Sequence, residues 1–167
     1  SYPMVGMSDV MPYSSSRFCE ITNHDINEYE TSFGNRLSTV ISAFQPDIIH
    51  SHHLWIVTSL TRRLFPEIPI ASTCHGSDLR QFQNCPHLQN RALSGCQALD
   101  AVMALSRVQK EDIVRLYHIP PNKIHVVGAG YNAELFTLHA KPDPNPVQLA
   151  YVGKLSSAKG VPWLLRS

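Results

Sequence analysis

The chain has 167 residues, of which 43% are hydrophobic and 16% charged, so it carries enough apolar material for a packed core and differs from disordered proteins. Its 14 Lys and Arg residues against 13 Asp and Glu residues give a net charge of +1, which excludes a broad electrostatic field for nucleic acid or for an anionic membrane. The sequence shows no unbroken apolar run of membrane-spanning length and no charged segment followed by an apolar stretch. It therefore predicts neither a membrane span nor a signal peptide.

The first regular element is a long helix. Residues 1–21 show no periodicity and are expected to be irregular. Thr22, with Asp25 three residues later, resembles a capping box, and apolar residues then recur at helical spacing until Pro46. The predicted apolar face of this helix comprises Ile26, Tyr29, Phe33, Leu37, Val40, Ile41 and Phe44.

After Pro46, short apolar segments alternate with helical ones. Strands are predicted over residues 47–50, 68–73, 101–105 and 123–127, and helices over residues 54–64, 86–96 and 107–117. Ser106 and Gln109 resemble a second capping box. Because the strands are continuous apolar runs, the pattern predicts an α/β fold: a Rossmann-like parallel sheet with helices on both faces.

The composition changes near the C-terminus. Three prolines between residues 142 and 146 favour an extended connector. Beyond it, residues 147–152 are predicted to form a strand and Gly160 to begin a helix, and such a pair cannot bury its own apolar faces. The expected domains are residues 1–137, a connector over 138–146, and the start of a second domain over 147–167.

The four cysteines are too widely and unevenly spaced for a metal-binding pair. Reduced thiols explain Cys19, Cys74, Cys85 and Cys96 better than a disulfide framework or a zinc knuckle does.

Candidate ligand-binding residues follow the predicted strands, since ligands of parallel α/β sheets bind at the carboxyl ends of the strands. His50 and His52 are expected to point the same way on one strand, with His53 next to them. These histidines either close the strand and cap the following helix or, less favourably, join His75 around a metal ion.

A second group spans residues 74–78. Gly76 would let a ligand approach the backbone, and Ser77 or Asp78 could cap a helix. A neutral His75 could bind a hydroxyl group or polarise a reacting group, although a purely structural histidine remains the alternative.

Two pairs of basic residues are further candidates. Lys154 and Lys159 flank a loop that leads into a helix N-terminus, so they would suit a diphosphate, unless they are ordinary solvated charges. Arg62 and Arg63 either contact a membrane interface or complement the dipole at a helix C-terminus, and the second interpretation is favoured.

The order of these segments resembles that in retaining glycosyltransferases of the GT-B fold, often called group 1. The matching segments are residues 46–50 with His52, residues 72–79, residues 104–106, residues 126–130 with Phe136, and residues 151–161.

Members of this family have two Rossmann-like domains and transfer a sugar from a nucleoside diphosphate with retention of configuration. The resemblance implies that residues 1–137 are part of the N-terminal, acceptor-side domain and that residues 147–167 are the first strand and helix start of the C-terminal, nucleotide-sugar-binding domain. The resemblance implies that His75 is catalytic and that Gly76, Asp78, Gly130, Lys154 and Lys159 bind the donor. It also implies no metal and no cofactor, because the lysines neutralise the leaving group.

The sequence departs from the family pattern in three ways. Lys154 replaces the usual arginine, exchanging a bidentate fork for a point charge. Gly128, Ala129 and Gly130 stand where Pro-Asn-Gly is common. The glycine-rich loop of the first strand and the paired glutamates of the second domain are not found, so this chain alone is expected to be inactive.

The resemblance therefore predicts a glycosyltransferase, cytoplasmic or peripheral at the inner face of the membrane. Its expected partners are a nucleoside-diphosphate sugar and a glycan, lipid or small-molecule acceptor, with no nucleic acid. A non-catalytic sugar-nucleotide or carbohydrate-binding module and a metal-dependent hydrolase are the alternatives.

Overall fold

The computed structural model describes residues 4–8, 11, 13–138, 145–153 and 155–167. Contacts divide the chain into two units, Ser1–Ala129 and Gly130–Ser167, and each unit is described by itself. Residues 139–144 of the predicted connector lie outside the described residues, and the predicted domain boundaries stay a prediction.

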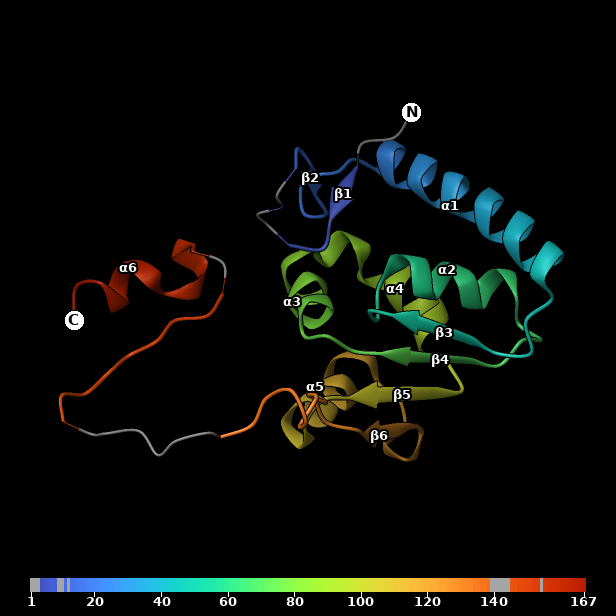
Figure 1. Ribbon diagram of the computed structural model, residues 1–167. Coiled ribbons are helices and arrows are strands. Elements are labelled where there is room, and N and C mark those ends of the chain that lie inside the picture. The colour runs from blue at the N-terminus through green and yellow to red at the C-terminus, as the bar shows by residue number, and fades with distance from the viewer. Residues whose placement is uncertain (1–3, 9–10, 12, 139–144, 154) are drawn as a thin grey trace. The chain divides into compact units, whose positions relative to one another are not determined.

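A four-stranded parallel sheet forms the centre of the first unit (Figure 1). Its strands lie in the order β3 (Ile49–His52), β4 (Ile70–Thr73), β5 (Ala101–Ala104) and β6 (Ile124–Val126). Along the chain they alternate with α2 (Ile56–Leu64), α3 (Ser77–Asn84), α4 (Gln89–Cys96) and α5 (Arg107–Tyr117), and short 3₁₀ helices cover Pro86–Leu88 and Pro121–Lys123. The predicted class is confirmed: an α/β, Rossmann-like parallel sheet with helices on both sides.

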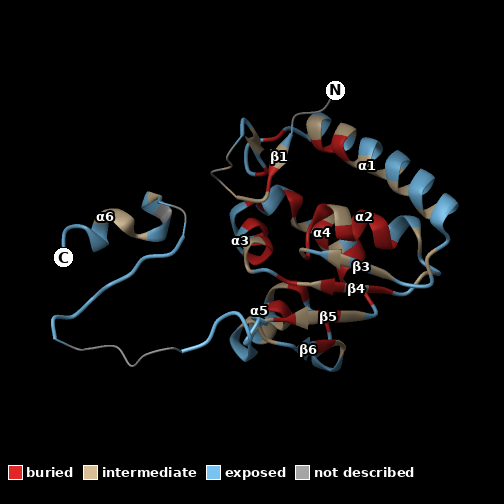
Figure 2. Ribbon diagram, in the orientation of Figure 1, coloured by how far each residue is buried: buried red, intermediate tan, exposed pale blue. Residues whose placement is uncertain are grey.

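The strands alternate between buried and partly exposed side chains instead of being buried throughout (Figure 2). On β4, Ile70 and Ser72 are fully buried, whereas Ala71 and Thr73 are half-buried. On the edge strand β3, His50 and His52 are exposed. The continuous apolar pattern of the sequence therefore does not reveal that every second side chain of these strands, His50 and His52 among them, is at least partly exposed to solvent.

Helix α1 (Asn23–Phe44) begins at the predicted capping box. The Asp25 amide donates to Thr22 Oγ1 at 3.2 Å, and the Thr22 amide donates to Asp25 Oδ2 at 3.1 Å. Hydrogen bonds from the Thr22 side chain and backbone lower the pKa of the Asp25 carboxyl.

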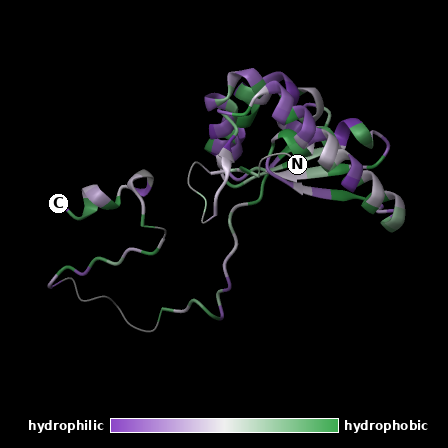
Figure 3. Cartoon of the chain, turned by 90° about the horizontal axis from the view of Figure 1, so that it is seen from above, coloured by the Kyte–Doolittle hydropathy of each residue, from purple (hydrophilic) through white to green (hydrophobic). Residues whose placement is uncertain are grey.

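Only the first half of the predicted apolar face of α1 is buried. Ile26 and Tyr29 belong to the core, whereas Val40 and Phe44 are 46% and 77% exposed. Helical periodicity marks which side of a helix is apolar, but it does not say how far a neighbouring element extends along that side. Figure 3 shows how hydrophobic and hydrophilic residues are distributed over the chain.

The N-terminal segment, expected to be irregular, contains two short strands. β1 (Val5–Gly6) and β2 (Ser16–Arg17) pair in parallel, and the Gln81 side-chain amide donates to Met7 O at 3.2 Å. Two-residue strands are too short to give a periodic signal, so the sequence could not reveal them.

The closest helix packing in the first unit joins α2 and α4. A Cβ built on Gly95 would lie 2.1 Å from the carbonyl oxygen of Ser59, and the Gly95 amide donates to Ser59 Oγ at 2.9 Å. Because backbone atoms form this contact, the helices would have to separate to admit a side chain.

Replacing Gly95 by alanine is therefore expected to lower the free energy of unfolding by about 1–3 kcal/mol through overpacking. Urea unfolding followed by circular dichroism measures the change. Gly34→Ala is the matched control, because a Cβ there would meet only Leu64 Cδ1 at an ordinary 3.4 Å, and alanine favours a helix interior. Equal stabilities of the two variants would contradict this account of the α2–α4 contact.

In the second unit, a 3₁₀ helix covers Ser157–Lys159 and α6 covers Val161–Leu164. The helix predicted from Gly160 is thus present, but the predicted strand over residues 147–152 is wrong, because these residues are irregular and exposed. A parallel strand needs a neighbour to satisfy its backbone groups, and in the described part of this unit no strand pairs with this segment.

All four cysteines are free in the structure, with Cys19 exposed and the other three buried. Burial raises the pKa of the Cys74 and Cys96 thiols above its usual value, so both stay protonated at neutral pH. Among the described residues, no helix is long and apolar enough to cross a membrane.

Candidate functional site

The candidate site lies where β3 and β4 end. The two strands are parallel and pair His52 with Thr73, so the residues that follow them, His53 and Cys74 to Gly76, emerge at the same edge of the sheet. The structure thus brings together two segments that are more than twenty residues apart in sequence, as expected for parallel strands.

Four imidazole rings gather at this edge. His52 Nδ1 lies 2.8 Å from His75 Nε2, and ring centroids are 4.7 Å apart for His50 and His52 and 4.8 Å apart for His53 and His75. A hydrogen bond between two ring nitrogens requires one of them to be an unprotonated acceptor. The His52–His75 pair therefore carries at most one positive charge while this bond is intact.

His50 and His52 point the same way along β3, as predicted, and His50 Nε2 lies 2.9 Å from Thr73 Oγ1. No group of three or more His, Cys, Asp or Glu side chains in the described part of the chain is arranged to hold a metal ion.

His53 has a more enclosed position than its neighbours. Its backbone is left-handed, with φ of 72°, and its carbonyl oxygen accepts a hydrogen bond from Thr58 Oγ1 at 2.6 Å. Burial lowers the pKa of His53, and His75 and His52 lower it further, whereas the Asp78 carboxylate acts in the opposite direction. His53 is therefore neutral at neutral pH.

Asp78 connects the two loops. It is fully buried in the first turn of α3, and its carboxylate accepts hydrogen bonds from the Leu54 amide at 2.7 Å and from the His75 amide at 3.2 Å. The Cys74 thiol donates to the same carboxylate at 3.5 Å. Asp78 is thus enclosed and holds the backbone of His75 in place, and its expected part in donor binding stays a prediction.

Gly76 is the N-cap residue of α3, with φ of 81°, a conformation that favours glycine. The nearest heavy atom to a Cβ built there would be Gln109 Nε2, at 3.6 Å, so the backbone beside His75 is not crowded. The approach of a ligand to this backbone stays a prediction.

The remaining predicted site residues lie elsewhere in the chain. Gly130 and Lys159 belong to the second unit, and Lys159 ends the 3₁₀ helix Ser157–Lys159. Lys154 lies outside the described residues. Their roles in donor binding stay predictions.

Arg62 and Arg63 lie in the last turn of α2, in line with the favoured interpretation that they are structural residues at a helix C-terminus. The Arg62 side chain is buried, forms an ion pair with Asp100 and donates to Pro66 O at 2.8 Å, and Arg63 pairs with Glu30 at 2.5 Å. Neither guanidinium is free to contact a membrane.

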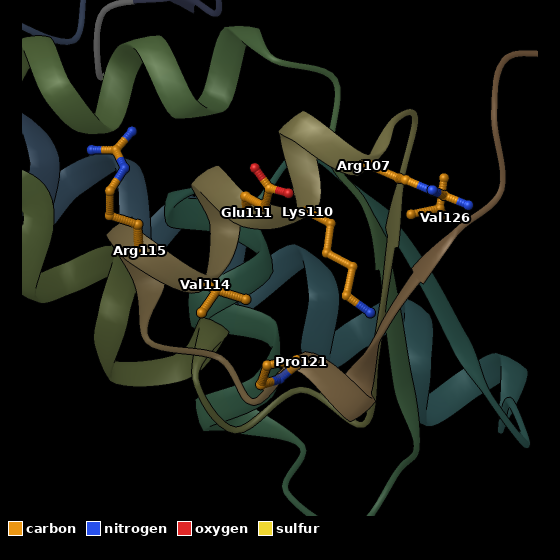
Figure 4. A pocket seen from close by; sticks show the side chains of 7 residues that line it. All are labelled: Arg107, Lys110, Glu111, Val114, Arg115, Pro121 and Val126. Carbon is orange, nitrogen blue, oxygen red and sulfur yellow. The ribbon is translucent and has the colours of Figure 1, made fainter.

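A cavity of about 560 Å³ lies between α5 and β6 (Figure 4). Two of its basic side chains already have partners, because Lys110 donates to Ile124 O at 2.7 Å and Arg115 pairs with Asp112 at 2.5 Å. None of the predicted site residues lines it. Its lining residues are Arg107, Lys110, Glu111, Val114, Arg115, Pro121 and Val126.

A smaller cavity of about 180 Å³ lies beside the histidines and was not expected from the sequence. Its wall includes His52, His53 and Trp55, whose indole carries no charge or motif that marks a site. The only sequence signal was its place directly after the histidine-rich strand.

Comparison with known proteins gives two findings. The model of Glycosyltransferase Family 4 matches residues 17–135. Glycogen synthases from Mycobacterium tuberculosis, strains CDC 1551/Oshkosh and ATCC 25618/H37Rv, are each 24% identical over 128 residues, which cover 71% of this chain and 31% of the relative. The chain thus spans about a third of the length of these relatives.

The family match covers the whole four-stranded sheet and the four histidines of the candidate site. It also covers the Asp78 bridge, which is the pair of hydrogen bonds from the Leu54 and His75 amides to the Asp78 carboxylate. The chain belongs to Glycosyltransferase Family 4.

Proposed function

We propose that this chain is part of a glycosyltransferase that moves a sugar from a nucleoside-diphosphate sugar to an acceptor with retention of configuration. The observation that carries the proposal is the position of His75, exposed at the carboxyl end of β4 beside the uncrowded Gly76 and oriented by His52. The family match over residues 17–135 supports the same chemistry.

In the proposed reaction, the bond between the anomeric carbon and the diphosphate breaks, and the diphosphate leaves with the electron pair. An acceptor hydroxyl oxygen forms the new bond to the same carbon, on the face that the diphosphate leaves, and the hydroxyl proton passes to the departing diphosphate. His75 contacts the donor sugar near this carbon, where charge develops, and Gly76 admits the donor to the backbone.

Lys154 and Lys159 are proposed to neutralise the diphosphate as it leaves, so the reaction needs no metal or cofactor. Gly130 is proposed to border the donor site. Each lysine at about 4 Å from a phosphate charge would contribute on the order of 4 kcal/mol at an effective dielectric constant of 20, before desolvation is subtracted.

We propose a cytoplasmic enzyme, or one at the inner face of the membrane, whose acceptor is a glycan, a lipid or a small molecule. The name of the relatives, glycogen synthase, favours a glycan acceptor.

The test is transfer by the complete enzyme from a panel of nucleoside-diphosphate hexoses labelled with ¹³C at the anomeric carbon. The expected product has the anomeric configuration of the donor, read from its carbon–proton coupling by NMR. Omission of the acceptor is the control for donor hydrolysis. An inverted product would overturn retention, and donor binding without transfer to any acceptor would instead indicate the non-catalytic binding module.

A further inference from the structure

Two side-chain contacts between β3 and β4 follow the same geometric rule. His50 is paired with Ala71, but its Nε2 atom lies 2.9 Å from Oγ1 of Thr73, two residues further on. His52 is paired with Thr73, and by the same step its Nδ1 atom lies 2.8 Å from Nε2 of His75. The contact between His52 and His75 therefore follows from the register of the two strands.

The ring of His52 is held between two other rings. Its centroid lies 4.7 Å from that of His50 and 5.1 Å from that of His75, and the ring planes are tilted by 42° and 33°. His52 also belongs to a strand, whereas His75 lies in the loop after β4. Because side chains on strands are placed more precisely than those on loops, His52 is the fixed partner of the two.

His75 is held at its backbone and at one ring nitrogen. Its amide donates to Asp78 Oδ1 at 3.2 Å, and the amide of the preceding Cys74 donates to Met103 O at 2.9 Å. His52 engages the Nε2 atom of the ring, and no residue in the described part of the chain bonds to its Nδ1 atom. Since the His75 side chain is exposed, Nδ1 is the ring nitrogen left for a ligand.

The bond to His52 also decides which nitrogen of His75 carries the proton. One hydrogen atom lies between the two bonded nitrogens, so a neutral pair has only two arrangements. If His75 donates, both rings carry their proton on Nε2, which is the tautomer that an isolated neutral histidine favours. If His52 donates, both rings carry it on Nδ1. The first arrangement avoids two unfavourable tautomers, and it leaves Nδ1 of His75 unprotonated.

We propose that His52 is a positioning residue, which accepts the Nε2–H of His75 and thereby presents an unprotonated Nδ1 to the donor sugar. The assignment rests on the proposed function, in which His75 contacts the sugar near the anomeric carbon. That carbon becomes electron-poor as the diphosphate leaves with the electron pair. A lone pair on Nδ1 complements this positive charge, whereas an N–H group would oppose it.

The kinetic test is a double-mutant cycle in the complete enzyme. His52→Ala is expected to lower kcat about ten-fold at a nearly unchanged donor KM, because the ring of His75 loses its orientation. In the His75→Ala background the same change is expected to have no further effect, since His52 acts only through His75. His52→Asn is expected to regain most of kcat, because Asn Oδ1 can take the place of Nδ1 and accept the same hydrogen bond.

A spectroscopic readout follows the pair without turnover. In the complete enzyme labelled with ¹⁵N-histidine at mildly alkaline pH, His75 is expected to have a protonated Nε2 and an unprotonated Nδ1. His52→Ala is expected to move both ¹⁵N shifts of His75 toward the averaged values of a free imidazole. His125→Ala is the control, because His125 is exposed on β6, the opposite edge strand, and it is expected to change neither kcat nor these shifts.

The outcomes separate this proposal from the proposed function. If the enzyme transfers sugar but His52→Ala keeps the wild-type kcat, or lowers kcat further in the His75→Ala background, the positioning role is overturned and the function stands. The role is also overturned if His52→Asn is as slow as His52→Ala, or if Nδ1 of His75 is protonated in the wild type. If the ¹⁵N shifts behave as expected but the enzyme transfers no sugar, the assignment of the histidine pair stands and the proposed function fails.

Discussion

Replacement of His75 by alanine is expected to lower kcat for sugar transfer about 30- to 1,000-fold and to leave the donor KM nearly unchanged. The imidazole lies at the open end of β4, where its polar atoms can meet charge that develops on the reacting sugar. Loss of such an oriented group costs the transition state about 2–4 kcal/mol and the bound substrate much less. Initial rates at varied donor concentration separate the two effects.

His87→Ala is the control for this experiment, because His87 is also exposed but belongs to the 3₁₀ helix Pro86–Leu88 and contributes nothing to the candidate site. It is expected to keep the wild-type kcat. If His75→Ala kept the wild-type kcat as well, His75 would be removed from the mechanism and would become a structural histidine.

Asp78→Ala is expected to cost about 3 kcal/mol in the free energy of unfolding. The variant removes a fully buried acceptor and leaves the amides of Leu54 and His75 without a partner, each at a cost of about 1–3 kcal/mol. Asp78→Asn retains one acceptor oxygen and is expected to lose about half as much. Urea unfolding followed by circular dichroism measures both variants.

Asp112→Ala supplies the comparison, because Asp112 pairs with Arg115 on the surface of α5 and such pairs contribute about 0–1 kcal/mol. Similar losses for Asp78→Ala and Asp112→Ala would show that the buried bridge does not stabilise the fold. A loss of unfolding free energy confined to the Asp78 variants would support a stabilising role of the buried Asp78 hydrogen bonds.

Local signals carried most of the fold prediction. The capping box at Thr22 and Asp25 fixed the start of α1, and Ser106 Oγ accepts from the Gln109 amide at the start of α5 as expected. A capping box also predicts that the Ser106 amide donates to the Gln109 side chain. In the structure, the Leu105 amide, one residue earlier, donates to Gln109 Oε1 instead. Such signals lie within a few residues of one another, so a single sequence reveals them.

Errors occurred where structure depends on partners distant in sequence. The segment 147–152 has the composition of a strand, but no described neighbour pairs with it. The second half of α1 has an apolar face that no described element covers fully, which leaves Phe44 exposed. Composition and periodicity report what a segment could bury, not what it meets.

The candidate site was predictable only in part. His75 and Gly76 stand out because a histidine and a glycine follow a strand, but the His52–His75 bond and the Asp78 bridge depend on the register of β3 and β4. The burial of the Trp55 indole N–H, which has no hydrogen-bond partner among the described residues, depends on side-chain packing and has no signal in the sequence.

The Asp78 bridge also bears on the entropy of substrate binding. One carboxylate holds the amide of His75 and the amide of Leu54, the residue before Trp55, so both walls of the candidate site are fixed before any ligand arrives. Binding to mobile loops loses conformational entropy that must be offset by contacts. Here the backbone at His75 and Leu54 already lost this conformational entropy when the chain folded. A larger part of the free energy of each ligand contact is therefore expected to contribute to the binding affinity.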